Sequence, residues 1–212
     1  MEKFGNITLY NADCMEVMKT FKDKQFSLAI VDPPYGIGID GQKEDVKQGR
    51  QIRKAHDFKG WDNAIPSEEY FIELKRVSRN QIIWGGNYFT KFLPPTKAWI
   101  FWYKGQQGLT MSDGEMAWTS FDTAVRFFRY HRGQQTDKRI HPTQKPVQLY
   151  KWLLQNYAKE GDTILDTHFG SLSIGIACHD LKFDLTAIEL DKDYYEAGKK
   201  RLIEHQMQLT IF

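Results

Sequence analysis

Two acidic residues follow short apolar segments that are typical of buried strands, and both are candidates for chemistry. Asp32 comes after FSLAIV at 26–31 and is followed by Pro33, Pro34 and Tyr35, while Asp166 comes after TIL at 163–165. In open α/β sheets, ligands bind beyond the carboxyl ends of the strands. We therefore expect the chemistry of this protein in the loops that begin at Asp32 and Asp166.

The segment 161–190 has the order strand, turn, helix and strand, and Glu189 closes its second strand. Asp166 and Glu189 are 23 positions apart (189 − 166), which is close to the spacing at which nucleotide-binding folds place an acid on ribose hydroxyls. The glycine pattern of a pyrophosphate site is incomplete, because Leu172 stands where a second glycine would follow Gly170. These residues favour an adenosyl ligand without phosphates, and an ordinary βαβ unit without a ligand is the alternative.

The pattern of apolar residues predicts the elements that position these acids. Short β-branched and aromatic runs predict strands near 7–10, 26–31, 81–85, 97–103, 115–121, 124–130, 163–166 and 184–189. Helical spacing is clearest at 68–77 and at 145–158, where Pro146 suits a first turn. Alternating strands and helices predict an α/β fold with a mostly parallel sheet and helices on both faces.

Two polar segments interrupt this alternation. Residues 36–62 are rich in glycine and basic residues and are long for an ordinary connection. Residues 126–145 have a local charge of +5, from Arg126, Arg129, Arg132, Lys138, Arg139 and Lys145 against Asp137. A solvated basic face and a nucleic-acid contact surface are both consistent with such a patch.

Composition narrows the class of protein. The 212 residues suit one domain, and 29 basic against 27 acidic residues mean that a nucleic-acid partner must meet a local patch. The two cysteines, Cys14 and Cys178, form no disulfide framework and no metal-ligand cluster, so we expect no metal. With no signal-peptide pattern and no apolar run of membrane-spanning length, we expect a cytoplasmic protein without a membrane partner.

Three stretches in a fixed order carry a family resemblance: DPPYG at 32–36, HPTQKP at 141–146, and ILDTHFGS at 164–171 followed by IELDKDYYEAGKKRL at 188–202. They resemble the S-adenosylmethionine-dependent DNA amino-methyltransferases of the β arrangement, in which the catalytic motif precedes the cofactor motif. The likeness is greatest to the short phage- and prophage-type adenine-N6 enzymes. It implies a Rossmann-like class I methyltransferase fold with a seven-stranded sheet, in a single domain over 1–212.

The resemblance implies that Asp32 and the carbonyl of Pro33 accept the hydrogens of the target amino group. Such acceptors are needed because an exocyclic aromatic amine is a poor nucleophile, whereas a sulfonium methyl needs mainly in-line placement. Pro33 and Pro34 would stiffen the loop, and Tyr35 would stack on a base flipped out of the duplex.

The resemblance also implies a set of cofactor residues. Asp166 and the turn at Gly170 and Ser171 would surround the methionine part of S-adenosylmethionine, and Glu189 would bind the ribose hydroxyls. Asp13 would accept from the adenine amino group. Thr143 and Lys145 would lie near the cofactor carboxylate, with a solvated lysine as the alternative for Lys145.

The turn after Asp166 departs from the family pattern. Thr167, His168 and Phe169 replace the usual Pro-Phe, and Leu172 and Ser173 replace a second Gly with Thr. Leu172 would either fill space beside the adenosine or weaken cofactor binding. His168 is expected to be a turn or pocket-wall residue and not a catalytic base.

Target recognition is expected within 104–140, with 36–62 as another recognition or mobile segment. Arg126, Arg129, Arg132 and Arg139 would hold DNA phosphates, which contribute affinity without sequence information. Asn87 would approach the pocket, with an ordinary turn asparagine as the alternative.

The sequence thus predicts a site-specific DNA methyltransferase that transfers a methyl group from S-adenosylmethionine to adenine N6 after base flipping. The alternatives are a cytosine-N4 DNA methyltransferase, an RNA or protein glutamine methyltransferase, and a catalytically silent nucleic-acid-binding protein. The expected partner is DNA. We expect a monomer or homodimer, in a bacterial or phage-infected cell with a restriction-modification or phage context.

Overall fold

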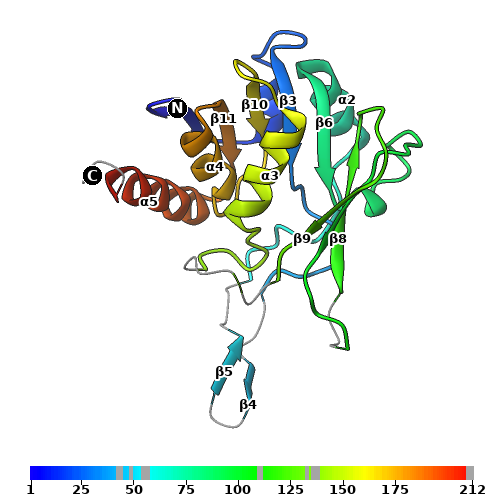
Figure 1. Cartoon of the computed structure of the whole chain (residues 1–212). Helices are drawn as coiled ribbons and strands as arrows, with labels where there is room; N and C mark the ends of the chain where they lie inside the picture. The colour runs from blue at the N-terminus through cyan, green and yellow to red at the C-terminus, as the bar shows by residue number, and fades with distance from the viewer. Residues whose placement is uncertain are drawn as a thin grey trace.

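The computed structural model describes residues 1–41, 45–47, 50–53, 58–108, 112–131, 134 and 139–208. Its main feature is one large sheet (Figure 1). Within the described residues this sheet has nine strands in the order β1 (Glu2–Phe4), β2 (Ile7–Asn11), β11 (Asp184–Glu189), β10 (Thr163–Asp166), β3 (Phe26–Val31), β6 (Ser78–Trp84), β8 (Gly114–Thr119), β7 (Ile100–Tyr103) and β9 (Arg126–Arg129).

The central part of the sheet is parallel. Strands β2, β11, β10, β3 and β6 pair in parallel, whereas β8 is antiparallel to both β6 and β7. The mostly parallel sheet predicted from the sequence is confirmed. It has nine strands where the family resemblance implied seven; the edge strand β9 matches the strand predicted at 124–130, whereas β1 at the other edge was not among the predicted strands.

Helices cover both faces of the sheet. These are α1 (Cys14–Met18), α2 (Glu68–Val77), α3 (Val147–Tyr157), α4 (Ser173–Leu181) and α5 (Lys192–Gln208), with a short 3₁₀ helix η1 (Gly86–Tyr88). In β3, Leu28 and Ile30 pack with α3, α4 and α5, whereas Ala29 and Val31 pack with α1 and α2. This alternation is why the strand reads as a continuous apolar run.

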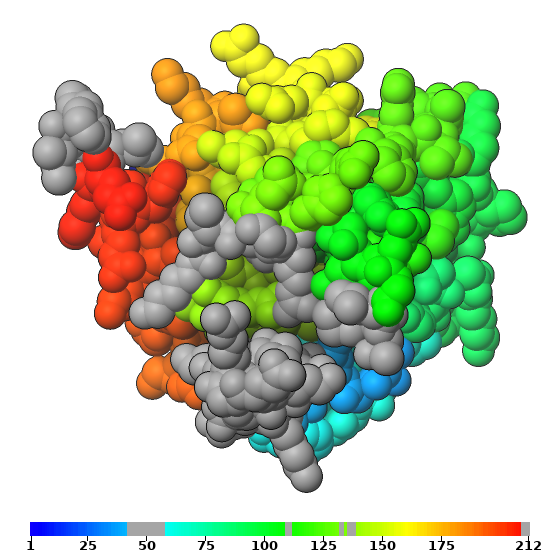
Figure 2. Space-filling view, turned by 60° about the horizontal axis from the view of Figure 1, so that its bottom comes forward, coloured from blue at the N-terminus to red at the C-terminus, as the bar shows by residue number. Residues whose placement is uncertain are grey.

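The 36–62 segment contains a small separate hairpin of β4 (Asp45–Lys47) and β5 (Arg50–Arg53). The hairpin stands away from the main sheet at the bottom of Figure 1. Figure 2 looks toward this end of the molecule, where orange, yellow-green and blue parts of the chain are all visible on one face. Residues far apart in the sequence therefore meet at one edge of the fold.

No helix in the described part of the chain is long and apolar enough to cross a membrane. The cellular location and the oligomeric state stay predictions.

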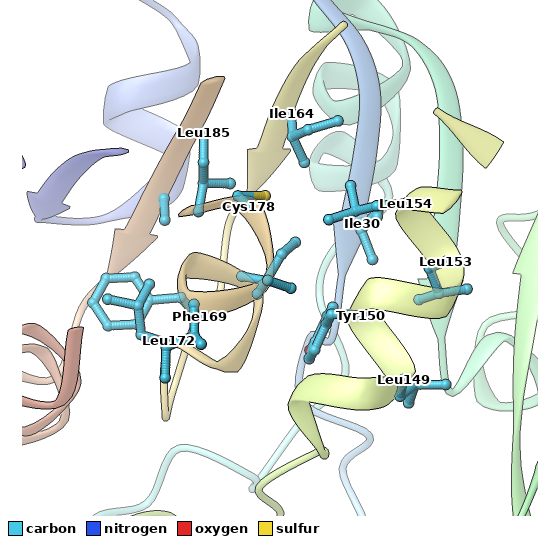
Figure 3. Packing of buried hydrophobic residues seen from close by; sticks show 14 of the residues in the cluster. Ile30, Leu149, Tyr150, Leu153, Leu154, Ile164, Phe169, Leu172, Cys178 and Leu185 are labelled. Carbon is cyan, nitrogen blue, oxygen red and sulfur yellow. The ribbon is translucent and has the colours of Figure 1, made fainter. Parts of the chain in front are cut away.

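Leu172 belongs to the hydrophobic core. Its side chain is 0% exposed and packs in the cluster that contains Phe169 (Figure 3). Its Cγ lies so close to Gly175 that a Cβ there would come within 2.7 Å of it, and a Cβ at Gly198 would come within 3.1 Å of the Leu172 Cβ. The residue at the start of α4 thus fills space between α4 and α5, although its φ of 55° is in the left-handed region.

Replacing Leu172 tests this packing role. We expect Leu172→Ala to lower the free energy of unfolding by about 3 kcal/mol, because it leaves a cavity. Leu172→Gly should also destabilise, since relief of the left-handed backbone returns only about 1 kcal/mol. Urea unfolding measures both. The control Leu190→Ala, at a 70% exposed position, should change stability by less than about 0.5 kcal/mol; an equal effect there would contradict a core role.

Candidate active site

Four acidic residues lie at the ends of four neighbouring parallel strands. Asp13 follows β2, Glu189 ends β11, Asp166 ends β10 and Asp32 follows β3. Parallel strands have their carboxyl ends at the same edge of a sheet, so these residues converge although they are up to 176 positions apart (189 − 13). The two loops selected from the sequence are therefore adjacent, as β3 pairs directly with β10.

Asp32 is held by two groups. The hydroxyl of Tyr35 donates to Asp32 Oδ1 over 2.6 Å, and the ammonium of Lys145 forms an ion pair with Asp32 Oδ2. Burial raises the pKa of Asp32 above its ordinary value, while the nearby charge of Lys145 opposes that rise. An amine that binds to this carboxylate must share it with, or displace, one of these donors.

Lys145 is 3% exposed, so the solvated alternative for it is wrong. Its ammonium lies between Asp32 and Glu115, with 3.1 Å from Nζ to Glu115 Oε2, and its expected place near the cofactor carboxylate stays a prediction. Glu115 also pairs with Lys104. The physical reason is that a buried ammonium must be paired, and these two carboxylates are the partners that the fold supplies.

The two carboxylates of this network, Asp32 and Glu115, face the two ammonium groups of Lys145 and Lys104, but the cations stabilise Glu115 more than Asp32. Burial opposes the ionisation of Glu115, yet two cations, Lys145 and Lys104, outweigh it and lower the pKa of Glu115 to about 2. Burial likewise opposes the charge of Lys145, and Asp32 and Glu115 together raise its pKa. Among the described residues, Asp32 has one cationic partner, Lys145. Glu115 and Lys104 carried no motif in the sequence and were missed, because their role depends on β7 and β8 lying side by side.

The ring of Tyr35 rests on residues that follow β6. It stacks on Tyr88 at 5.1 Å between ring centroids and an interplanar angle of 17°. Gly85, with a φ of 69°, lies beneath it, where a Cβ would come within 2.2 Å of the Tyr35 ring. Tyr88 is 44% exposed; the run WGGNY at 84–88 was the available signal for this aromatic pair.

Some other described residues around Asp32 and Tyr35 show no contact that assigns them a role. Asn87 is exposed in η1 next to Tyr88, so its approach to the pocket stays a prediction. Pro33 is buried and Pro34 partly buried directly after Asp32. Trp84 and Trp118 are core residues.

Asp166 is 1% exposed, and its Oδ1 accepts from the backbone N–H of His168 over 3.0 Å. Burial raises the pKa of Asp166 to about 8, and the charges of Asp32 and Glu189 add to the rise. Burial also lowers the pKa of His168 to about 4. The imidazole contacts Thr167 and Tyr70, which is the surrounding of a neutral wall residue.

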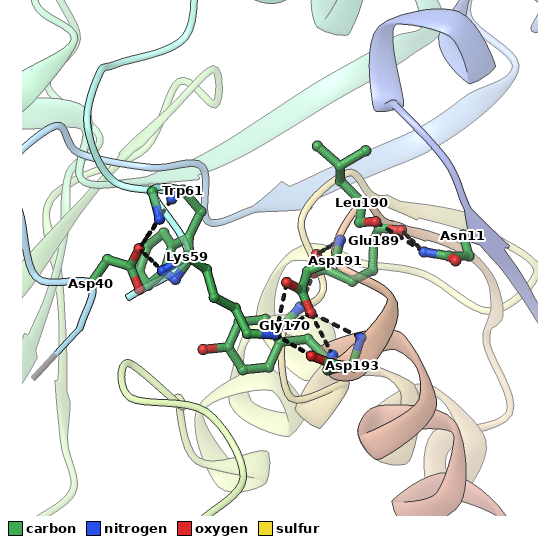
Figure 4. Close-up of polar contacts among 11 residues, drawn as sticks. Asn11, Asp40, Lys59, Trp61, Gly170, Glu189, Leu190, Asp191 and Asp193 are labelled. Carbon is green, nitrogen blue, oxygen red and sulfur yellow. Dashed lines mark hydrogen bonds and ion pairs between the residues drawn. The ribbon is translucent and has the colours of Figure 1, made fainter. Parts of the chain in front are cut away.

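Glu189 is fixed by two backbone groups (Figure 4). Gly170 N–H donates to Oε2 and Asp191 N–H to Oε1, both over 2.9 Å. Burial raises the pKa of Glu189. The Gly170 turn and the end of β11 are thereby joined through one carboxylate, and the role of Glu189 toward ribose hydroxyls stays a prediction.

The remaining predicted cofactor residues have partners within the chain. Asp13 is exposed and caps α1 through Met15 N–H. Ser171 is buried, and its hydroxyl lies 3.1 Å from that of Ser173. The hydroxyl of Thr143 lies 3.1 Å from His141 Nδ1. Their roles toward a cofactor stay predictions.

The described part of the basic patch does not form one face. Arg126 and Arg129 are both exposed on β9, but residues three apart on a strand point to opposite sides of the sheet. Arg139 is exposed before the HPTQKP segment. Arg132 lies outside the described residues, as do Asp137 and Lys138.

The model of the N6/N4 DNA methylases matches residues 79–200, more than half of the chain. The chain belongs to this family. Its relatives include the type II methyltransferase M.HpaI of Haemophilus parainfluenzae, 24% identical over 90% of this chain and 72% of the relative. The N6/N4 family membership confirms the resemblance to S-adenosylmethionine-dependent DNA amino-methyltransferases and the cofactor inferred from it.

Solved structures share the fold of this family member. The M1.HpyAVI–SAM complex aligns with a TM-score of 0.63 at 21% identity, covering 92% of this chain and 98% of that one. The PvuII cytosine-N4-specific DNA methyltransferase aligns with a TM-score of 0.61 at 12% identity, covering 96% and 95%. The class I methyltransferase fold is confirmed.

The pH dependence of stability tests the state of Asp166 in this N6/N4 methylase. Its folded pKa of about 8 lies above the ordinary 3.8, so the folded protein binds more protons between these values. The stabilisation by the neutral carboxyl is full below about pH 4 and is lost as the pH rises through 8. Asp166→Asn stays neutral, so its stability relative to wild type should increase from pH 5 to pH 8 in urea unfolding.

The control for this experiment is Asp122→Asn. Lys97 lowers the pKa of this exposed carboxyl, so it stays ionised throughout that range. Its stability relative to wild type should not change between pH 5 and pH 8. If Asp166→Asn shows the same flat difference, the Asp166 carboxyl is not protonated in the folded protein.

Proposed function

We propose that this DNA methyltransferase methylates the N6 amino group of adenine. The observation that carries the proposal is the Asp32-Pro33-Pro34-Tyr35 segment, which lies at the strand end next to the buried Asp166 and the partly buried Glu189. In the resembling enzymes, an Asp before the two prolines favours adenine, whereas cytosine-N4 enzymes more often have Ser there. Cytosine N4 is the second candidate, since a cytosine-N4-specific enzyme shares the fold.

The chain can supply what an exocyclic amine needs in order to react. When bound, S-adenosylmethionine supplies an electrophilic methyl group on a sulfonium. Asp32 and the Pro33 carbonyl would accept the two amine hydrogens, which directs the nitrogen lone pair toward that methyl group. Methyl transfer from the sulfonium would leave the positive charge on the amine. Asp32, whose pKa is raised by burial, can take the proton that the amine then loses.

Tyr35 has the surroundings of a base platform. Its hydroxyl is tied to Asp32 and its ring is supported by Gly85 and Tyr88. A flipped base needs an aromatic face within reach of the group that accepts the amine hydrogens. Here that group is Asp32, which accepts a hydrogen bond from the hydroxyl on the Tyr35 ring. Lys145 balances the Asp32 and Glu115 charges beside them.

The acids at the neighbouring strand ends fit the cofactor. A buried carboxyl with a pKa of about 8 becomes ionised when a cation binds to it, so Asp166 would hold the ammonium of the methionine part. Glu189, already oriented by two N–H groups, would accept from the ribose hydroxyls. Gly170 would line the same turn, and Asp13 would bind the adenine.

We infer that residues 1–212 act as one domain. The recognition segments proposed at 36–62 and 104–140 contain the β4–β5 hairpin and strands β8 and β9. Arg126 and Arg129 are exposed on opposite sides of β9 and therefore cannot hold the same stretch of DNA backbone through one flat face.

The first experiment identifies the methylated base. The protein is expressed in a host without DNA methylation, and modified bases are mapped across the genome. N6-methyladenine at one sequence is expected, and N4-methylcytosine would contradict the adenine assignment. Asp32→Ala should lower the rate of transfer at least about 100-fold, because it removes an acceptor from the amine. The control Asp23→Ala changes an exposed acid at the other end of β3 and should transfer normally.

The second experiment measures cofactor binding. At pH 7, S-adenosylmethionine binding should release close to one proton, because Asp166 must ionise to bind the ammonium. Calorimetry in buffers with different ionisation enthalpies counts that proton. Asp166→Asn should release none, and Glu189→Ala should bind about 10-fold or more weakly through loss of charged hydrogen bonds. Binding without proton release in the wild type would remove Asp166 from the ammonium site.

A further inference from the structure

Asp62 is a buried carboxylate outside the recognised motifs. It is 1% exposed, and its two oxygens accept three backbone hydrogen bonds. Oδ1 accepts from Tyr35 N–H and Gly36 N–H, and Oδ2 from Ile39 N–H, each over 2.8 Å. The backbone that follows the two prolines is thus bound to a side chain 27 positions later in the sequence.

Asp40 makes the reciprocal contact. It is 7% exposed, and its Oδ2 accepts from the N–H groups of Lys59, Gly60 and Trp61. Each carboxylate therefore binds the backbone beside the other, and together they close the base of the 36–62 segment. We name this pair of contacts the clasp.

The clasp is anchored next to the proposed ribose site. Lys59 Nζ lies 2.8 Å from Asp191 and 2.7 Å from Asp193, at the start of α5 (Figure 4). Asp191 N–H in turn donates to Glu189. The loop that carries Tyr35 is therefore attached to the same strand end as Glu189.

Tyr35 needs such support because residues 32–41 lie outside every helix and strand, and the backbone N–H of Gly38 is bonded to the Asp62 carbonyl rather than to a strand. The hydroxyl of Tyr35 is fixed by Asp32 and its ring by Tyr88, which leaves the backbone as the part that Asp62 determines. Gly36 has a φ of 69°, and a Cβ there would come within 3.1 Å of Ile65 N. The loop is accordingly packed close to the chain that carries Asp62.

We propose that Asp62 is a positioning residue for methyl transfer. It holds the backbone of Tyr35 so that the Tyr35 ring and Asp32 contact the same base. The proposal rests on the proposed function of Tyr35. A carboxylate suits the task because both of its oxygens accept, whereas an asparagine keeps one acceptor oxygen and its NH₂ group would face either Ile39 N–H or the N–H groups of Tyr35 and Gly36.

The test is a double-mutant cycle between Asp62 and Tyr35. Asp62→Asn should lower kcat for DNA methylation about 10- to 100-fold, since misplacement by about 1 Å costs that much. The Kd for S-adenosylmethionine should stay within about twofold. In a Tyr35→Ala background, Asp62→Asn should change the rate less than about threefold, because there is no ring left to misplace.

Equal factors in both backgrounds would overturn the proposal, since a general loss of structure acts whether or not Tyr35 is present. Thermal melting sets an assay temperature at which every variant is folded. If Asp62→Asn does not fold, the cycle is run with Asp62→Glu, whose displaced carboxylate must show the same coupling to Tyr35; additive effects there also overturn it.

The matched control is Asp180→Asn. Asp180 is a partly buried carboxylate paired with Lys151 and His205 near the end of α4, and its replacement should leave kcat and the coupling to Tyr35 unchanged. A wild-type protein that transfers no methyl group to DNA is a different result. It refutes the proposed function itself, and the positioning role falls with it.

Discussion

Parallel pairing of β2, β11, β10 and β3 is the constraint on which the site depends. Each of these strands ends at the same edge of the sheet, and an acid stands at or just after each end. None of the four acids is near all the others in sequence. The sheet supplies their common location, and the alternating apolar residues of β3 hold it there by packing against helices on both faces.

Convergence of carboxylates has an electrostatic cost that the structure offsets in two ways. Around Asp32 the repulsion between carboxylates is offset by an ion pair with the buried Lys145, which also pairs with Glu115. Around Asp166 and Glu189 the described residues offer backbone N–H groups and no ion pair with a cation, and burial leaves both pKa values raised. The half of the site nearest Asp32 is thus balanced within the chain, whereas the other half is suited to a positively charged ligand.

Specific contacts fix the conformation of the loops around the site, as strand pairing fixes the sheet. Gly85 makes room for the Tyr35 ring, and Asp62 and Asp40 fix the loop backbone by reciprocal hydrogen bonds. Leu172 shows the same dependence on context. In the sequence it stands where a glycine of the cofactor turn was expected, whereas in the fold it is a core residue whose packing maintains a left-handed backbone.

The sequence by itself determined the strands and helices that border the site, the DPPY segment and the spacing between Asp166 and Glu189. Those features are local, because periodicity, turn residues and short motifs are properties of adjacent residues. Only the tertiary structure decided that Lys145 pairs with Asp32, that Glu115 and Lys104 complete that network, and that Asp62 holds Tyr35. The physical reason is that a buried charge or N–H group takes whichever partner the packed elements bring within hydrogen-bond distance, and that partner carries no mark in the sequence.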